Sequence, residues 1–230
     1  MTTVELRRSN QWFEANTEGK RKRRVESKKE LFERILLPEK AKLRSVLETG
    51  ICESASTIWL MQNIQPDQWV GIDPWKPGRK HHVEMFATYE RNCRYNLWAA
   101  GADLPKPVNG ELMSNCQFRI GETHCRVVKA SSHDYLRMGV DVDYGEGVCF
   151  DLVLVDADHS APGTLIDMVL GWRKLKPGGL MIVDDFDRRW HNARPNVHEA
   201  VLAFWNCFEH LAVKEVETKK HVVIRRKLDG

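Results

Sequence analysis

The sequence has little that points to a membrane, a disulfide framework or a nucleic-acid partner. No apolar run approaches the ~18 residues of a membrane-spanning helix, and residues 1–10 lack the apolar core of a signal peptide. The six cysteines include no Cys-x-x-Cys pair and no framework spacing, which favours reduced thiols. The net charge of +3 is too small to indicate nucleic acid by itself. We therefore expect a soluble, cytoplasmic protein with no membrane partner.

The sequence does contain the composition and patterning of an ordinary globular domain. It is 42% hydrophobic and 29% charged, and its 230 residues are enough to bury one substantial core. It has no internal repeats and no low-complexity tract. Short apolar runs alternate with helical patterns, which predicts an α/β fold. We expect a single-domain, Rossmann-like doubly wound sheet, mostly parallel, with a C-terminal antiparallel hairpin.

Two of the apolar runs end in a cluster of carboxylates. Nearly continuous apolar runs of this length are typical of strands that are buried on both faces of a parallel sheet. The runs are 150–155 and 180–183, and the groups that follow them are Asp156, Asp158, His159, Asp184 and Asp185. A right-handed crossover brings the carboxyl ends of both strands to one edge, where open α/β sheets bind their ligands. The acids and the histidine therefore predict a functional site.

The remaining elements are expected at shorter, weaker patterns. Ser27-Lys28-Lys29-Glu30 has the form of a capping box, and the helix that it begins ends at Pro38. We predict an N-terminal helical extension over residues 1–44 and the main domain over 45–230. Residues 101–123 are rich in Pro, Gly and Asn and are predicted to be an irregular insertion. The other predicted strands are 45–48, 69–72, 126–130, 211–216 and 221–225.

A glycine turn follows the first predicted strand. Glu48 and Gly50 stand at this turn, and Asp73 ends the next strand, where a carboxylate can accept two ribose hydroxyls. A dinucleotide site favours further glycines at the positions of Cys52 and Ser54, because side chains there obstruct a pyrophosphate. The turn therefore favours a nucleoside cofactor without phosphates over NAD.

These motifs resemble those of the class I S-adenosylmethionine-dependent methyltransferases. The resemblance runs in order from Val46 to Arg226. The motifs also resemble one branch of this family, the cation-dependent O-methyltransferases, which include the catechol, caffeoyl-CoA and macrolide-sugar enzymes. The motifs are Glu48-x-Gly50, Gly71-Ile72-Asp73-Pro74-Trp75, Val155-Asp156-Ala157-Asp158-His159-Ser160, Leu175-Lys176-Pro177-Gly178-Gly179 and Val183-Asp184-Asp185.

The resemblance implies a set of residues that bind S-adenosyl-L-methionine. Glu48 and Gly50 would lie at its methionine end, and Asp73 would hold the ribose hydroxyls. Ser131 or Ser132 would lie near the adenine, where many relatives carry an aspartate. The other candidates are Trp75, which would shield the adenine or the sulfonium, and Asp156.

The resemblance also implies a metal site and a general base. Asp156, Asp184 and Asp185 match the ligand positions of the metal-dependent branch, and oxygen ligands suit Mg²⁺, with Mn²⁺ and Ca²⁺ as alternatives. His159 is the first candidate for the base, since its ordinary pKa of about 6.5 suits proton transfer near neutrality, and Asp158 is the second. The simpler alternatives are that Asp184 or Asp185 caps a loop, that Asp156 is the generic acid of this strand end, and that His159 lies on a loop surface or caps a helix.

Three functions remain open at this point. The leading one is divalent-metal-assisted O-methylation of a small hydroxylated molecule by this methyltransferase. A nucleic-acid methyltransferase is an alternative, with the basic segments Lys20–Arg24 and Lys76–His82 as its binding surface. A non-catalytic, methyltransferase-like binding protein is the third. The exposed N-terminal helix also suggests a homodimer.

Overall fold

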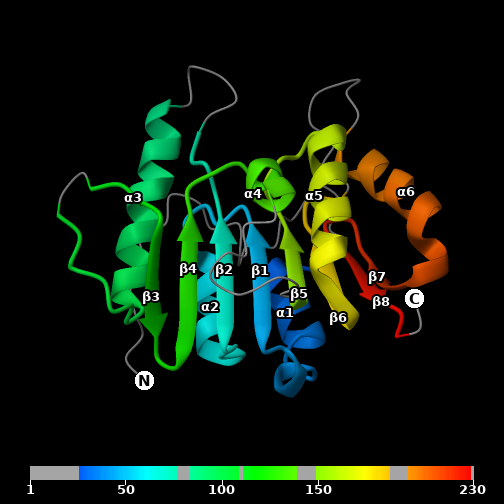
Figure 1. Ribbon diagram of the computed structural model, residues 1–230, viewed down its shortest axis with the longest axis horizontal. Helices are drawn as coiled ribbons and strands as arrows, with labels where there is room; N and C mark the ends of the chain where they lie inside the picture. Colours follow the sequence, from blue (N-terminus) through cyan, green and yellow to red (C-terminus); the bar gives the residue numbers. More distant parts are fainter. Residues whose placement is uncertain (1–25, 77–82, 109–110, 139–148, 187–195, 229–230) are drawn as a thin grey trace.

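One sheet with helices on both faces makes up the described part of the protein (Figure 1). The computed structural model describes residues 26–76, 83–108, 111–138, 149–186 and 196–228. The basic segment Lys20–Arg24 lies outside these residues, as does most of Lys76–His82. None of the described helices is long and apolar enough to cross a membrane.

The sheet has eight strands in the order β3-β4-β2-β1-β5-β6-β8-β7. Neighbours from β4 to β6 pair in parallel, whereas β3, β7 and β8 pair antiparallel to their neighbours. The α/β class and the C-terminal hairpin are therefore as predicted. The strands are β1 (Ser45–Thr49), β2 (Gln68–Ile72), β3 (Cys116–Ile120), β4 (Thr123–Val128), β5 (Phe150–Val155), β6 (Leu175–Val183), β7 (Ala212–Glu217) and β8 (Val222–Arg226).

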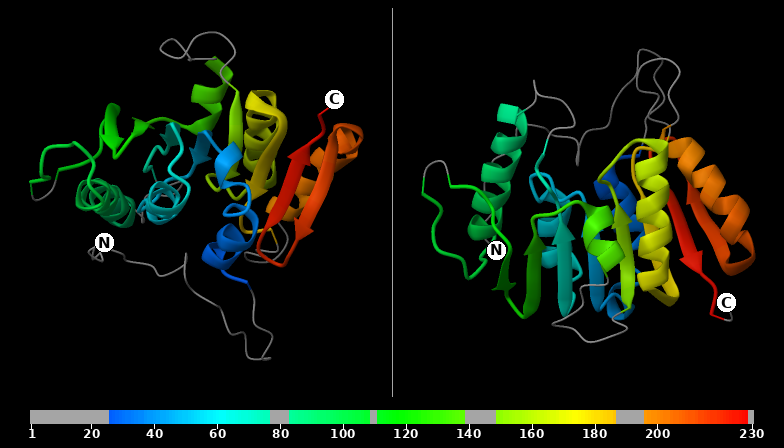
Figure 2. Two further views of the ribbon diagram at one scale, coloured as in Figure 1. Left: turned by 90° about the horizontal axis from the view of Figure 1, so that it is seen from below. Right: turned by 45° about the horizontal axis from the view of Figure 1, so that its top comes forward.

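Helices of the described part of the chain cover both faces of the sheet, as Figure 2 shows in its view from below. Apolar residues of α1, α2 and α3 share one core, and those of α4, α5 and α6 share the other. The helices are α1 (Lys28–Ile35), α2 (Ala55–Asn63), α3 (Val83–Ala99), α4 (Ser132–Met138), α5 (Ala161–Lys174) and α6 (Val197–Phe208), and two short 3-10 turns are η1 (Lys40–Lys42) and η3 (Glu209–Leu211).

Alternation along the central strands separates these two cores. In β5, Leu152 and Leu154 belong to the core under α1 to α3, whereas Val153 and Val155 belong to the other. All four side chains are almost fully buried. Successive residues of a strand point to opposite faces, so a strand between two helical layers must be apolar at every position. This is the pattern from which the buried strands were predicted.

Two predicted segments differ from the structure. Residues 116–120, inside the predicted irregular insertion 101–123, form β3 and pair with β4 as an edge hairpin. Its burial alternates only partly, which leaves a weak sequence signal. Lys176–Gly179, whose proline and two glycines are typical of a turn before the predicted strand 180–183, instead lies within β6, where the pairing shifts from Phe150–Leu175 to Leu152–Leu180. The boundary between residues 44 and 45 stays a prediction.

The strand order reverses between β1 and β5, because the chain passes from β1 to β2 on one side and reaches β5 on the other. The crevice outside the carboxyl ends of two such strands is where open α/β sheets bind ligands. Gly50 follows β1 and Asp156 follows β5, so both motifs of the sequence meet at this point.

Candidate active site

The turn after β1 is packed directly against the turn after β5. Gly50 has a φ of +83°, and a Cβ at this position would lie 2.0 Å from the backbone oxygen of Asp156. Its N–H donates to the carbonyl of Ile72 over 2.8 Å, which also ties it to the end of β2. Only glycine fits a position that combines a positive φ with so close a backbone approach. The backbones of the predicted cofactor turn and the predicted acid cluster therefore pack directly against each other.

The next positions of this turn keep a backbone typical of glycine. Cys52 and Ser54 have φ values of 51° and 63°, in the left-handed region. Residues other than glycine adopt this region at a cost of roughly 1–2 kcal/mol each. Ser54 is fully buried, and its hydroxyl donates to the carbonyl of Glu53 over 2.6 Å. Strained backbone of this kind is concentrated at ligand sites.

Asp73, the predicted ribose-binding acid, holds the glycine turn in place. Its two carboxylate oxygens accept the backbone N–H groups of Cys52 (2.9 Å) and Trp75 (2.7 Å). Burial raises the pKa of Asp73 from 3.8 to about 6, and these two hydrogen bonds oppose the rise. Trp75 is itself buried, and its indole N–H donates to the carbonyl of Cys52 over 3.0 Å. Its ring therefore packs onto the turn from the β2 side.

Glu48 is buried beneath the same turn among neutral donors. Its carboxylate accepts hydrogen bonds from the hydroxyl of Ser56, the hydroxyl of Thr57 (2.7 Å) and the indole of Trp69 (3.0 Å). Burial raises the pKa of Glu48, whereas Lys28 and the three donors lower it. This side chain joins β1 to α2 and β2 and so supports the turn, and its place beside the methionine end of the cofactor stays a prediction.

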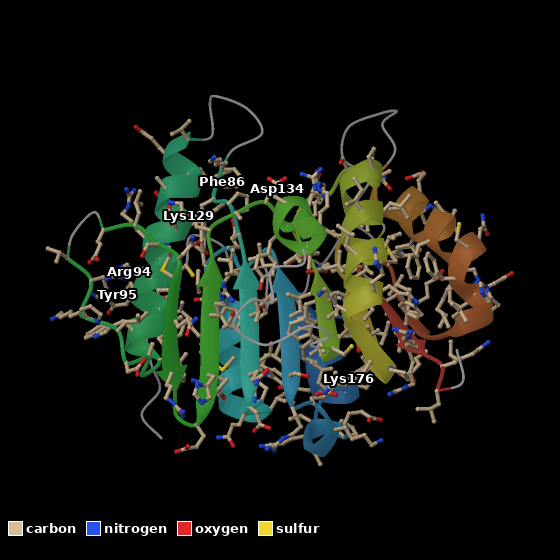
Figure 3. The ribbon with its side chains drawn as sticks, in the orientation of Figure 1. Phe86, Arg94, Tyr95, Lys129, Asp134 and Lys176 are labelled. Atoms are coloured by element: carbon tan, nitrogen blue, oxygen red, sulfur yellow. The ribbon has the colours of Figure 1, made fainter. Side chains whose placement is uncertain are left out.

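The two predicted adenine-side serines begin α4. The hydroxyl of Ser131 and the side chain and backbone of Asp134 exchange two hydrogen bonds of 3.1 Å, and Ser132 is buried. Asp134 lies at the edge where β1, β2, β4 and β5 end (Figure 3). Lys129, also at this edge, pairs with buried Glu90 of α3. The sequence did not single out this ion pair, which ties α3 to the end of β4.

Three of the predicted site residues come together after β5 and β6. The imidazole Nε2 of His159 lies 3.3 Å from Oδ1 of Asp156 and 3.4 Å from Oδ2 of Asp185. One ligand atom from each of the three residues lies within 4.8 Å of the others. Asp185 has a φ of 58°, a strained conformation that aims its side chain here. Two carboxylates and an imidazole at this spacing fit a divalent cation such as Mg²⁺ or Mn²⁺.

Asp184, the third predicted metal ligand, has other partners. Its Oδ2 lies 3.2 Å from the ammonium of Lys28, and its Oδ1 lies 3.0 Å from Nε2 of His221 and accepts the N–H of Asp185 over 2.8 Å. Burial alone would raise the pKa of Asp184, but Lys28 and His221 hold it well below its ordinary range. The structure therefore brings Asp156 and Asp185 together around His159, whereas both oxygens of Asp184 are engaged by Lys28, His221 and a backbone N–H.

The sequence analysis missed Lys28, as it missed His221, the other partner of Asp184. Lys28 is 8% exposed, and its ammonium lies 2.7 Å from Oδ2 of Asp156. Burial opposes its charge, but Asp156 and Asp184 raise its pKa above the ordinary value. A signal was present: Lys28 precedes Leu31, Phe32 and Ile35 at the i, i+3, i+4, i+7 spacing of a buried helical face.

Asp158, the second candidate for the general base, caps a loop. Its Oδ1 accepts the N–H of Ser160 over 2.9 Å, and a Cβ on Gly163 would lie 2.1 Å from its Oδ2. The carboxylate is therefore packed against the first turn of α5. His159 is the candidate base that the structure brings against the acids.

A comparison with protein families identifies the class of the protein. The sequence profile of a family described as a methyltransferase domain matches residues 47–186, which include every residue of the turn and the acid cluster apart from Lys28 and His221. The chain belongs to this methyltransferase family. The predicted class, a class I S-adenosylmethionine-dependent methyltransferase, is thus confirmed. Among curated proteins, none matches this sequence.

Solved structures share the fold at low sequence identity. A Klebsiella pneumoniae protein described as an O-methyltransferase is 18% identical, with a TM-score of 0.56, and the match covers 88% of this chain and 81% of that chain. MycE methyltransferase of the mycinamycin pathway, solved with Mg, SAH and mycinamycin VI, is 14% identical, with a TM-score of 0.53. That match covers 86% of this chain and 49% of the MycE chain, so this chain spans about half the length of MycE.

A third structure shows that this fold does not decide the methyl acceptor. A Clostridium thermocellum protein described as an rRNA methylase is 10% identical, with a TM-score of 0.50, over 84% of this chain and 95% of that one. One fold serves many acceptors, so the acceptor must be argued from the site itself.

Proposed function

We propose that the chain transfers the methyl group of S-adenosylmethionine to a hydroxyl of a small molecule, at a site built from Asp156, His159 and Asp185. The observation that carries this proposal is the contact of His159 with both carboxylates. One of these carboxylates belongs to Asp156, whose backbone packs against Gly50. The donor and the acceptor hydroxyl would thus meet where the strand order reverses. MycE, a structural neighbour solved with Mg and SAH, supports the same chemistry.

The cofactor would occupy the turn after β1. Asp73 would take the ribose hydroxyls in place of one of its backbone donors, and the glycine at position 50 leaves room for the methionine end beside Asp156. Ser131 and Ser132, at the start of α4, would border the adenine. Trp75 would close the turn against water.

The acceptor would react by in-line displacement. Its oxygen attacks the sulfonium methyl carbon, the C–O bond forms as the C–S bond breaks, and the electron pair of that bond stays on sulfur. The hydroxyl proton passes to the imidazole of His159, which Asp156 and Asp185 orient. Positioning at a near-attack distance of about 3–3.5 Å supplies much of the acceleration. A divalent cation held by Asp156 and Asp185 would lower the pKa of the hydroxyl when bound.

The test combines cation removal with two variants. After treatment with EDTA, S-adenosylhomocysteine formation is measured with catechol, a dihydroxybenzoate and a vicinal sugar diol, while Mg²⁺ or Mn²⁺ is added back. We expect His159→Gln and Asp185→Asn each to lower kcat about 10²–10⁴-fold. The affinity for S-adenosylmethionine, measured by calorimetry, should not change.

Asp67→Asn is the matched control, because Asp67 is an exposed acid before β2 whose carboxylate pairs with Arg44. Full activity of the EDTA-treated protein removes the cation from the proposal. Full activity of His159→Gln removes the base. Failure to bind S-adenosylmethionine at all favours a non-catalytic binding protein.

A further inference from the structure

Lys28 bridges two carboxylates that belong to different strands. Its ammonium lies 2.7 Å from Asp156, after β5, and 3.2 Å from Asp184, after β6. The lysine comes from α1, which covers one face of the sheet (Figure 2). It is 8% exposed, so little water screens these contacts. A chain segment more than a hundred residues away in sequence thus delivers a positive charge to the acid cluster.

The position of Lys28 is unfavourable for a lysine in two respects. It begins α1, where the helix dipole disfavours a cation by about 0.3–1 kcal/mol, and it lies on the apolar face beside Leu31 and Phe32. Burying an ammonium also costs several kcal/mol unless good partners are present. Asp156 and Asp184 are those partners, so the carboxylates determine this arrangement rather than the helix.

Four charged groups of the cluster together carry the charge that would balance one divalent cation. Among the residues that the structure describes here, three carboxylates, those of Asp156, Asp184 and Asp185, face the ammonium of Lys28, so these four groups carry two net negative charges. Both oxygens of Asp184 are engaged, by Lys28 on one side and by His221 and a backbone N–H on the other. One oxygen of Asp156 and the carboxylate of Asp185 remain on the side of His159.

We propose that Lys28 is a positioning residue that withholds Asp184 from the cation and sets the charge and the affinity of the cation site. This inference rests on the cation site of the proposed function and goes beyond it, because it assigns the limit on affinity to a residue of α1. Removal of the ammonium would leave three negative charges and free one oxygen of Asp184. The site would then bind divalent cations more tightly and would accept trivalent ones.

Lys28→Met tests this inference, because methionine keeps the apolar stem and removes the charge. Binding of Mn²⁺ to the full chain is measured by electron paramagnetic resonance, without acceptor or turnover. We expect the affinity to rise roughly tenfold or more, since a fixed charge within ~4 Å of a partly buried dication acts strongly. Binding of Tb³⁺, followed by its luminescence, should rise by a larger factor than that of Mn²⁺. Lys29→Met, at the neighbouring position of α1, should change neither.

The double variant Lys28→Met with Asp184→Asn restores two negative charges. We expect its Mn²⁺ affinity to return to within about threefold of the natural chain, because Coulombic attraction depends on net charge. Thermal unfolding with and without Mn²⁺ is the second readout, and the cation should stabilise Lys28→Met more than the natural chain. If Lys28→Met does not fold, Lys28→Gln takes its place in both measurements.

The outcomes separate this inference from the proposed function. If the natural chain binds Mn²⁺ and Lys28→Met binds it equally or more weakly, Lys28 is a structural partner only and the inference is overturned. If Lys28→Met binds Mn²⁺ and the natural chain does not, the inference stands and the cation leaves the proposed function. If neither binds Mn²⁺, the inference fails and the cation leaves the proposed function, whose methyl transfer is tested separately by S-adenosylhomocysteine formation.

Discussion

The carboxylates of the glycine turn and those of the acid cluster are held by different kinds of partner. Glu48 and Asp73 accept hydrogen bonds from neutral groups, namely hydroxyls, an indole and backbone N–H groups. Asp156 and Asp184 face the ammonium of Lys28 and two imidazoles. Both regions lie at one edge of the same sheet, and their backbones touch. The two groups of acids therefore differ in the chemistry of their hydrogen-bond and ion-pair partners and not in their position in the fold.

The pKa values of the two acids shift in opposite directions, because both kinds of partner lower the pKa against burial but only the charged partners outweigh it. Burial raises the pKa of Asp73 to about 6, so its ionised form costs stability, and the cost grows as the pH rises from about 4 to about 6. Lys28 and His221 lower the pKa of Asp184, so it stabilises the fold above its ordinary pKa and loses this contribution as the pH falls below it. Neutral donors would suit the ribose-binding role that we propose for Asp73, whereas the charged partners of Asp184 keep its carboxylate ionised.

Gly50→Ala should have the largest effect, because it pushes the two regions apart. The added Cβ would lie 2.0 Å from the backbone oxygen of Asp156, and the φ of +83° is strained for alanine. We expect a loss of about 4 kcal/mol or more in the free energy of unfolding, or no soluble protein. Urea denaturation measures the first outcome, and calorimetry with S-adenosylmethionine measures the accompanying loss of binding.

Gly101→Ala separates the contact from the backbone strain. Gly101 has a similar φ, +94°, but a Cβ there meets no atom within 4 Å. Its cost should be only about 1–2 kcal/mol, the cost of a left-handed conformation. Equal losses in the two variants would mean that the contact between the turns contributes nothing.

Asp73→Asn should have the next largest effect, and its sign depends on pH. The difference between 3.8 and about 6 in pKa corresponds to ~3 kcal/mol that the natural chain loses as the pH rises across this window. The variant has no such loss, although its amide replaces one acceptor of the two backbone N–H groups. We therefore expect its stability relative to the natural chain to increase by up to ~3 kcal/mol from pH 4 to pH 7 in urea denaturation.

The exposed acid Asp67, paired with Arg44, supplies the control variant Asp67→Asn. Its difference from the natural chain should change by less than about 1 kcal/mol over the same range. A difference for Asp73→Asn that stays constant with pH would show that burial does not govern this acid, and the contrast with Asp184 would be lost.

Much of the fold follows from the sequence, because its buried strands carry a strong local signal. Continuous apolar runs at 150–155 and 180–183 predict central strands, and the acids that follow them must then lie at one edge. The edge strand β3 has no such run, since only one of its five residues is fully buried. Its pairing with β4 is a non-local contact that periodicity does not show.

The residues of the candidate site that follow strands were predictable from the sequence. Those that reach the site from other elements, such as Lys28 of α1, were not. Asp156, His159 and Asp185 follow β5 and β6, and Asp73 follows β2. Lys28 reaches the cluster from α1, and a lysine in a capping box resembles an ordinary solvated charge. The orientation of Asp184 toward Lys28 depends on that long-range contact, so a ligand set taken from motif order alone includes an acid whose oxygens are already engaged.

Ser27→Ala should have the smallest effect and sharpens the comparison at the α1 end. Ser27 caps α1 in a capping box: its hydroxyl accepts the N–H of Glu30 over 3.2 Å, and its own N–H donates to the Glu30 carboxylate over 2.9 Å. The cap precedes Lys28 directly, so it fixes where the lysine leaves the helix. We expect a loss of about 1 kcal/mol in urea denaturation, the usual value of an N-cap side chain. Binding of S-adenosylmethionine should not change, because the glycine turn is held by other elements.

Glu30→Gln, which keeps the form of the capping box, should cost less than Ser27→Ala. If Ser27→Ala instead lowers the binding free energy of S-adenosylmethionine as much as it lowers the free energy of unfolding, α1 supports both regions. The glycine turn and the acid cluster would then differ in their partners but share a supporting helix.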